Sequence, residues 1–261
     1  MKVGFIGYGA IGHAVGRAID DGLAGDTTLS AILVRRPAQL QDVPDEIVAT
    51  DDLARFLAVE TELVVEVAGH AALRQHLAAV LESGRDLMTL SVGAFADAEF
   101  LARAEELARR FGRRILIPSG AIAGLDMISA AALGPLDTVT HTTHKHPRAF
   151  TAEQLGGIDP TEAVLLYDGP ARDGVGRFPE NVNVAAAVSL AGIGLDRTRL
   201  RVFADPATDR NRHVVEVTGY FGRLRLEVEN QPSENPKTGR VVPLSVAKAL
   251  RNLGAPIVLG L

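Results

Sequence analysis

The sequence predicts an α/β protein, in which an N-terminal doubly wound parallel sheet precedes a second α+β domain with a largely antiparallel sheet. Three observations support this prediction. A glycine-rich turn directly follows the first apolar run, and apolar runs then alternate with helical patterns to about residue 120. Beyond about residue 135 the apolar residues recur at every second position instead. The expected domains are residues 1–120 and 121–235, with a final helix within about 236–261 packing back on the first domain.

The glycine-rich turn is Gly7-Tyr8-Gly9-Ala10-Ile11-Gly12, between an apolar run at 3–6 and a helical pattern at 13–19. A Rossmann-type dinucleotide-binding turn requires this context. Gly7 permits the tight turn, Gly9 lets the backbone approach a pyrophosphate, and Gly12 lets the helix pack closely on the strand. The first N–H groups of the helix, from Ala10 and Ile11 onward, are then available to phosphate oxygens. The alternative is a strand-to-helix turn that binds nothing.

Further strands and helices alternate through the first domain. The apolar runs predict strands at 29–34, 63–67, 86–92 and 115–117. Leu73, Leu77 and Leu81 recur at helical spacing, and a second helix is expected to begin after Asp97 as N-cap and to end at Gly112. Such alternation is typical of a parallel sheet with crossover helices.

The pattern changes in the second domain. Period-two alternation predicts strands at 138–144, 198–203, 213–217 and 224–228, with Gly219 and Gly222 at a turn. Helices are expected at about 183–195 and at 243–253, the latter with Pro243 near its start.

Composition excludes several classes of function. The absence of cysteine excludes disulfides, thiolate metal sites and a cysteine nucleophile. A formal net charge of −5 provides no basic surface, so nucleic acid is not an expected partner. No apolar run is long enough for a membrane span, and early charged residues argue against a signal peptide. We expect a cytoplasmic protein that binds small molecules.

The residues after the second strand bear on the choice of cofactor. An NAD-preferring site usually has an acid there, whereas this chain has Arg35 and Arg36. Two guanidinium groups suit the 2′-phosphate of NADP, so we expect NAD or NADP with NADP accepted. The alternative is two solvated arginines. Small residues after later strands, where open α/β sheets bind ligands, would admit a nicotinamide ring: Ala68, Gly69, Ser91 and Gly93.

Four longer segments resemble the signature segments of L-aspartate dehydrogenases. They lie at 118–126, 178–186, 209–213 and 235–238, with sequences PSGAIAGLD, FPENVNVAA, DRNRH and NPKT. With the glycine turn, the resemblance covers essentially the whole chain. It implies oxidation of L-aspartate by NAD(P)⁺ to iminoaspartate, which hydrolyses to oxaloacetate and ammonia or feeds NAD synthesis. A homodimer is also expected.

The resemblance implies roles for individual residues. His213 matches the catalytic histidine, and Ala121 and Asn183 match positions that contact the cofactor. A histidine suits this chemistry because one group titrating near neutrality can serve both amine deprotonation and water activation. The two carboxylates of aspartate require cations and hydrogen-bond donors, for which the candidates are His144, Lys145, Asn211, Lys237 and Thr238, with Arg240 as a further cation.

The chain departs from the family pattern at two places. Thr143-His144-Lys145-His146-Pro147 stands where the family commonly has Thr-Arg-Lys-Pro-Pro, and Gly239 stands where serine is common. His141, His144 and His146 are not expected to form a metal site, because positions 141 and 144 of a strand point to opposite faces. Ser119 has no G-x-S-x-G context, so a serine hydrolase is not expected.

Two other functions remain open from the sequence. One is a related dehydrogenase or imine reductase, similar to homoserine dehydrogenase or dihydrodipicolinate reductase. The other is a regulatory NAD(P)-binding module without catalytic activity. The second alternative explains the glycine turn but gives no reason for His213 and its neighbouring segments.

Overall fold

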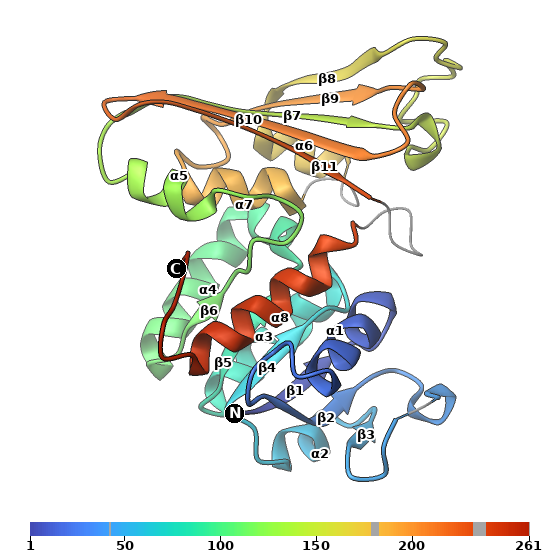
Figure 1. Ribbon diagram of the computed structural model, residues 1–261, viewed down its shortest axis with the longest axis vertical. Helices are drawn as coiled ribbons and strands as arrows, with labels where there is room; N and C mark the ends of the chain where they lie inside the picture. Colours follow the sequence, from blue (N-terminus) through green and yellow to red (C-terminus); the bar gives the residue numbers. More distant parts are fainter. Residues whose placement is uncertain (42, 179–182, 232–238, 261) are drawn as a thin grey trace. The chain divides into compact units, whose positions relative to one another are not determined.

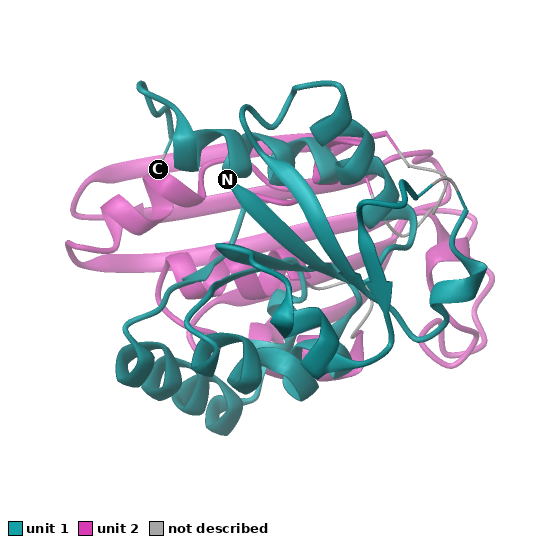
Figure 2. Cartoon of the chain, turned by 90° about the horizontal axis from the view of Figure 1, so that it is seen from below, with its two compact units in different colours: residues 1–118, 243–261 teal, residues 119–242 magenta. Residues whose placement is uncertain are grey.

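The computed structural model describes residues 1–261 except 42, 179–182, 232–238 and 261. The chain divides into two compact units, shown in two colours in Figure 2. Unit 1 comprises residues 1–118 and 243–261, and unit 2 comprises residues 119–242. No helix among the described residues is both long and apolar enough to cross a lipid bilayer.

Unit 1 contains a six-stranded sheet (Figure 1) in the order β3-β2-β1-β4-β5-β6. Every pairing in it is parallel, which confirms the predicted doubly wound sheet. The strand order reverses between β1 and β4, and such a reversal opens a ligand crevice at the carboxyl ends of the strands. The strands are β1 (Lys2–Ile6), β2 (Thr28–Leu33), β3 (Val48–Thr50), β4 (Leu63–Glu66), β5 (Asp86–Thr89) and β6 (Ile115–Leu116).

Helices cover both faces of this sheet. Helices α1 (Ala10–Asp20) and α8 (Val241–Gly254) share one buried core with β1, β4 and β5. Helix α2 (Leu53–Ala58) packs near β1, where a Cβ on Gly4 would lie 2.7 Å from the Phe56 ring. Helices α3 (His70–Glu82) and α4 (Ala98–Phe111) contact each other, and short 3₁₀ turns η1 (Pro37–Gln39) and η2 (Val92–Ala96) follow β2 and β5.

The predicted ends of α4 are confirmed. The Asp97 carboxylate accepts hydrogen bonds from the N–H groups of Glu99 and Phe100, and Gly112 has a left-handed φ of 60°. An N-cap side chain and a C-terminal glycine each satisfy backbone groups that the helix leaves unpaired. The short elements β3 and α2 were not predicted, because neither is long enough to establish a period.

Unit 2 contains a five-stranded sheet in the order β11-β10-β7-β9-β8 (Figure 1). Only β7 and β9 pair in parallel, so the prediction of a largely antiparallel sheet is confirmed. Strand β8 was not predicted. The strands are β7 (Leu136–Lys145), β8 (Val164–Pro170), β9 (Arg199–Ala204), β10 (Asn211–Gly219) and β11 (Gly222–Asn230), and the helices are α5 (Leu125–Ala131), α6 (Ala171–Arg177) and α7 (Asn183–Ala191), with a 3₁₀ turn η3 (Pro147–Ala149).

The two faces of this sheet differ. Helices α5, α6 and α7 lie on one side of it (Figure 1), and α5 and α7 share a buried apolar core with β7 and β10. We call this side the helical face, and it carries Val139, His141, Thr143 and Lys145 of β7 with Asn211, His213, Val215 and Val217 of β10. The opposite side is the open face, and it carries the intervening residues, among them Thr142, His144, Arg212 and Glu216.

Candidate functional site

The glycine turn of unit 1 is closed on one side and open on the other. Gly7 has φ = 92°, and a Cβ on it would lie 2.7 Å from the Cβ of Ala68. A Cβ on Gly12 would lie 2.9 Å from the carbonyl oxygen of Gly7. A Cβ on Gly9, in contrast, would meet no atom within 4 Å. Glycine at 7 and 12 is therefore required by the protein itself, whereas Gly9 leaves room for a ligand beside the backbone.

Unpaired N–H groups line this open side. The first hydrogen bond of α1 runs from the N–H of His13 to the carbonyl oxygen of Gly9, at 2.9 Å. The N–H groups of Ala10, Ile11 and Gly12 have no acceptor within the described part of the chain, and no side chain caps the helix. Three N–H groups at the positive end of a helix dipole favour an anion such as a pyrophosphate.

Arg35 and Arg36 lie beside the glycine turn in the fold. The N–H of Gly7 donates to the carbonyl oxygen of Leu33 at 2.9 Å, which ties the turn to the end of β2 just before the two arginines. Both arginines are exposed, and neither guanidinium has an ion pair within the described residues. Two unpaired cations therefore follow the second strand, where an acid would favour NAD.

A buried carboxylate that sequence reasoning missed shapes the next two loops. Glu66, at the end of β4, is fully buried and accepts hydrogen bonds from the N–H groups of Ala68 (2.7 Å) and Gly69 (2.8 Å) and from the Thr89 hydroxyl (2.6 Å). The Thr89 oxygen in turn accepts from the N–H of Ser91 at 3.0 Å. The N–H groups of these predicted cofactor residues are thus already used, and only their small side chains and carbonyls can meet a ligand. A lone acid in the apolar run of β4 was the available signal.

Gly93 is buried within η2, next to this hydrogen-bonded loop. Its predicted role beside the nicotinamide ring stays a prediction.

The chemistry-bearing residues of unit 2 lie on the helical face. His213 of β10 and His141 of β7 are 3 % and 0 % exposed. The Nδ1 atom of His213 lies 3.2 Å from Nε2 of His141, and the two rings stack with centroids 5.3 Å apart. The other ring nitrogen of His141, Nδ1, is buried and has no hydrogen-bond partner among the described residues. The structure thus brings together two imidazoles that are 72 residues apart in the sequence.

Burial governs the charge of this group. It lowers the pKa of Lys145 to about 8, and burial followed by the charge of Lys145 lowers the pKa of His141 to about 3. Burial, with smaller contributions from His141 and Lys145, also holds the pKa of His213 well below 6.5. Both imidazoles are therefore neutral at pH 7, and His213 can accept a proton there. The sequence argument expected His213 to titrate near neutrality, and it did not anticipate the depth of burial.

Asn230 holds the segment that contains Ala121, and Asn211 lies opposite it. Asn211 is 8 % exposed on the helical face, and it lies opposite Asn230 in the register of β10 and β11. The side-chain amide of Asn230 donates to the carbonyl oxygen of Ala121 at 2.7 Å. A Cβ on Gly239 would lie 2.8 Å from the Cβ of Asn230, so this contact explains the glycine there. Asn230 was missed because its partner is 109 residues away.

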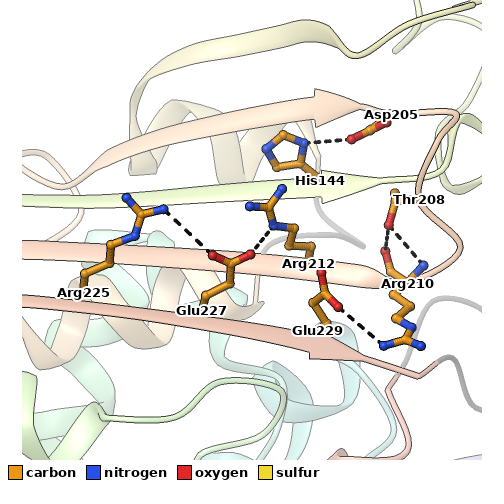
Figure 3. A network of polar contacts seen from close by, with 8 residues as sticks. All are labelled: His144, Asp205, Thr208, Arg210, Arg212, Arg225, Glu227 and Glu229. Atoms are coloured by element: carbon orange, nitrogen blue, oxygen red, sulfur yellow. Dashed lines mark hydrogen bonds and ion pairs between the residues drawn. The ribbon is translucent and has the colours of Figure 1, made fainter.

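His144 lies away from Lys145 and His213. It lies on the open face, where its Nδ1 is 3.1 Å from a carboxylate oxygen of Asp205 (Figure 3). Its ring also stacks on that of Phe203. Adjacent residues of a strand point to opposite faces, so the structure does not bring His144 to the group around His213. Arg212, next to His213, likewise faces outward and pairs with Glu227 (Figure 3).

The remaining predicted residues are placed as follows. Asn183 is exposed as the first residue of α7, Arg240 is exposed, and Lys237 and Thr238 lie outside the described residues. His141 and His144 lie on opposite faces of β7, and within the described ranges no three histidine or acidic side chains gather to hold a metal ion.

The chain resembles known dehydrogenases in both halves. Residues 126–253 match the family described as aspartate dehydrogenase, C-terminal, and residues 7–118 match the homoserine dehydrogenase NAD-binding domain. An L-aspartate dehydrogenase of Methanosarcina barkeri is 39 % identical, covering 100 % of this chain and 99 % of its own. L-aspartate dehydrogenase 3 of Bordetella bronchiseptica is 40 % identical, covering 100 % and 97 %.

Solved structures share the fold. The aspartate dehydrogenase of Thermotoga maritima superimposes with a TM-score of 0.80 at 26 % identity, covering 100 % of this chain and 99 % of its own. A hyperthermophilic archaeal homoserine dehydrogenase in complex with NADPH gives a TM-score of 0.62 at 13 % identity, covering 99 % of each chain, which is a similarity of fold alone.

Proposed function

The chain belongs to the L-aspartate dehydrogenase family, and from that premise we propose that it oxidises L-aspartate to iminoaspartate, with NAD⁺ or NADP⁺ as hydride acceptor and His213 as general acid and base. The observation that carries the proposal is the neutral, buried His213 beside His141, on the same face as Lys145. All three residues lie in the half of the chain that matches the aspartate dehydrogenase C-terminal family.

The residues of unit 1 fit a dinucleotide. The unpaired N–H groups of Ala10, Ile11 and Gly12 suit its pyrophosphate, and the space beside Gly9 lets the phosphates approach the backbone. Arg35 and Arg36 would bind the 2′-phosphate of NADP. Once bound, the nicotinamide supplies the hydride acceptor.

The side chains of unit 2 would handle protons and substrate charge. His213 would accept a proton from the substrate amine, and the electron pair left on the nitrogen would form the C=N bond as the Cα–H bond breaks and its own pair leaves as hydride toward the nicotinamide. Protonated His213 would return that proton to the imine nitrogen and, neutral again, take a proton from the water that attacks the same carbon. It would then give this proton to the nitrogen as the C–N bond breaks, which yields oxaloacetate and ammonia. Iminoaspartate that leaves before this step could feed NAD synthesis. Lys145, with Asn211 nearby, would bind substrate carboxylates, whose negative charge stabilises protonated His213.

The direct test is a substrate comparison. The purified chain is incubated at alkaline pH with NAD⁺ or NADP⁺ and with L-aspartate, D-aspartate or L-homoserine, and formation of reduced nicotinamide is followed by absorbance. We expect L-aspartate to be the preferred substrate. Preference for homoserine would favour the alternative that the NAD-binding half suggests. Cofactor binding without turnover of any amino acid would favour a regulatory module.

The double substitution of Arg35 and Arg36 by alanine tests the cofactor assignment. We expect the KM for NADP⁺ to rise by about 10- to 100-fold, because charge-assisted hydrogen bonds to the 2′-phosphate are lost. The KM for NAD⁺ should change little. Replacement of the exposed Arg103 of α4 by alanine is the matched control. An unchanged KM for NADP⁺ would remove both arginines from the phosphate site.

We also propose that the chain forms a homodimer through the open face of unit 2. Its charged side chains already pair within the chain, as Arg212 and Arg225 do with Glu227 (Figure 3), which lowers the cost of covering them. Light scattering is expected to give twice the mass of one chain. Thr142→Arg, in the middle of this face, should reduce that mass to one chain. A wild-type monomer would contradict the proposal.

A further inference from the structure

Packing alone does not explain the histidine at position 141. The ring is fully buried among the residues of the helical face, and its Nδ1 atom has no partner within the described chain. A phenyl ring would occupy similar space without leaving a polar atom unpaired, and an unpaired buried polar atom is unfavourable. Among the described residues, the His141 side chain makes one polar contact, at 3.2 Å to His213.

That contact determines which nitrogen of His213 is available. Because Nδ1 of His213 faces His141, Nε2 is the ring nitrogen left for substrate. A neutral imidazole carries one proton, and the hydrogen bond at one nitrogen decides which nitrogen carries it. A general base acting through Nε2 must carry its proton on Nδ1, so the partner of Nδ1 must accept a hydrogen bond.

We propose that His141 is a positioning residue, whose Nε2 accepts a hydrogen bond from Nδ1–H of His213 and thereby keeps Nε2 of His213 unprotonated and oriented for the reaction. This inference rests on the proposed role of His213. The strands make the arrangement rigid, because β7 and β10 are paired through their length and His213 lies opposite Thr143, two residues from His141. The acceptor is neutral, so it orients His213 without adding a buried negative charge.

The tautomer can be measured on the unmodified protein. The chain has seven histidines, and long-range ¹H–¹⁵N correlation spectra of ¹⁵N-histidine-labelled protein distinguish Nδ1–H from Nε2–H rings. His213→Asn assigns the signals of residue 213 by their loss. We expect His213 as the Nδ1–H tautomer at pH 7. A spectrum in which His213 carries its proton on Nε2 would overturn the proposal.

Variants of His141 test the consequence for turnover. His141→Phe keeps the ring but removes the acceptor, and we expect kcat to fall by about 10- to 100-fold with little change in the KM for aspartate. His141→Gln places an amide oxygen near the position of Nε2, and it should restore part of the loss together with the Nδ1–H signal of His213. His76→Gln, at a histidine of α3 that also has an unpaired Nδ1, should leave kcat unchanged.

The outcomes separate this inference from the proposed function. If His141→Phe is folded by circular dichroism and retains full kcat, His141 is not a positioning residue. If wild-type protein shows the Nδ1–H tautomer but does not oxidise aspartate, the hydrogen bond is supported and the proposed function fails. If both glutamine and phenylalanine variants lose activity equally while His213 keeps its Nδ1–H signal, the positioning role is overturned.

Discussion

Replacing His213 with alanine is expected to lower kcat for aspartate oxidation by about 10²–10⁴, the contribution that a positioned general acid–base group makes. His213 is neutral and 3 % exposed in the free chain, so it can accept the substrate's proton at pH 7. The measurement is the steady-state rate of nicotinamide reduction at saturating aspartate and cofactor. Full turnover in a folded variant would rule out the assignment.

A second substitution separates chemistry from packing at this position. His213→Asn keeps a polar atom near the position of Nδ1, which faces His141, but removes the atom that would face the substrate. Its kcat should fall about as far as that of the alanine variant. Binding of NADPH, measured by fluorescence, should stay within a few-fold of wild type for both, because the residues proposed to bind its phosphates belong to unit 1.

Replacing Lys145 with methionine is expected to raise the KM for aspartate by about 10- to 100-fold, because the buried cation proposed to pair with a substrate carboxylate is removed. The KM for the cofactor should change little. Methionine has a similar length and keeps the buried volume filled, and circular dichroism checks that the variant is folded. Lys2→Met, at an exposed lysine paired with Glu60, is the control. An unchanged KM for aspartate would remove Lys145 from the site.

The pKa of Lys145 gives this assignment a pH signature. Burial lowers that pKa to about 8, so the free chain loses the ammonium charge as the pH rises above 8. Succinate is a dicarboxylate without an amine, and its inhibition constant should be about tenfold higher at pH 9 than at pH 7. In Lys145→Met, succinate should bind weakly, and its inhibition constant should not change with pH over this range. A flat wild-type profile would contradict the role of Lys145.

The fold could largely be predicted because its signals are local. Each signal lies within a short stretch of sequence. Examples are the apolar run of a strand, the 3.6-residue period of a helix and a capping residue such as Asp97. The missed elements are short or lack a clear period. Strand β8, for example, alternates between half-buried and exposed residues at the edge of its sheet, so it shows no apolar stripe.

The candidate site could be predicted only in part because its contacts are long-range. The glycine turn and the two arginines are contiguous, and their arrangement follows from one strand-turn-helix unit. The partnership of His141 and His213 depends on the register between β7 and β10, which no local pattern specifies. The expectation that His144 binds substrate fails for a local reason instead, because adjacent residues of a strand point to opposite faces and Lys145 is on the helical face.

Strand β7 carries two sets of residues whose constraints are independent. Its odd-numbered positions from 139 to 145 hold the buried group, while its even-numbered positions meet the open face. Substitutions at the even positions can therefore change what the open face binds without changing the buried chemistry. A change in strand length is different, because insertion of one residue exchanges the two sets. We infer that the buried group tolerates substitutions at the even positions of β7 but not the insertion or deletion of a single residue.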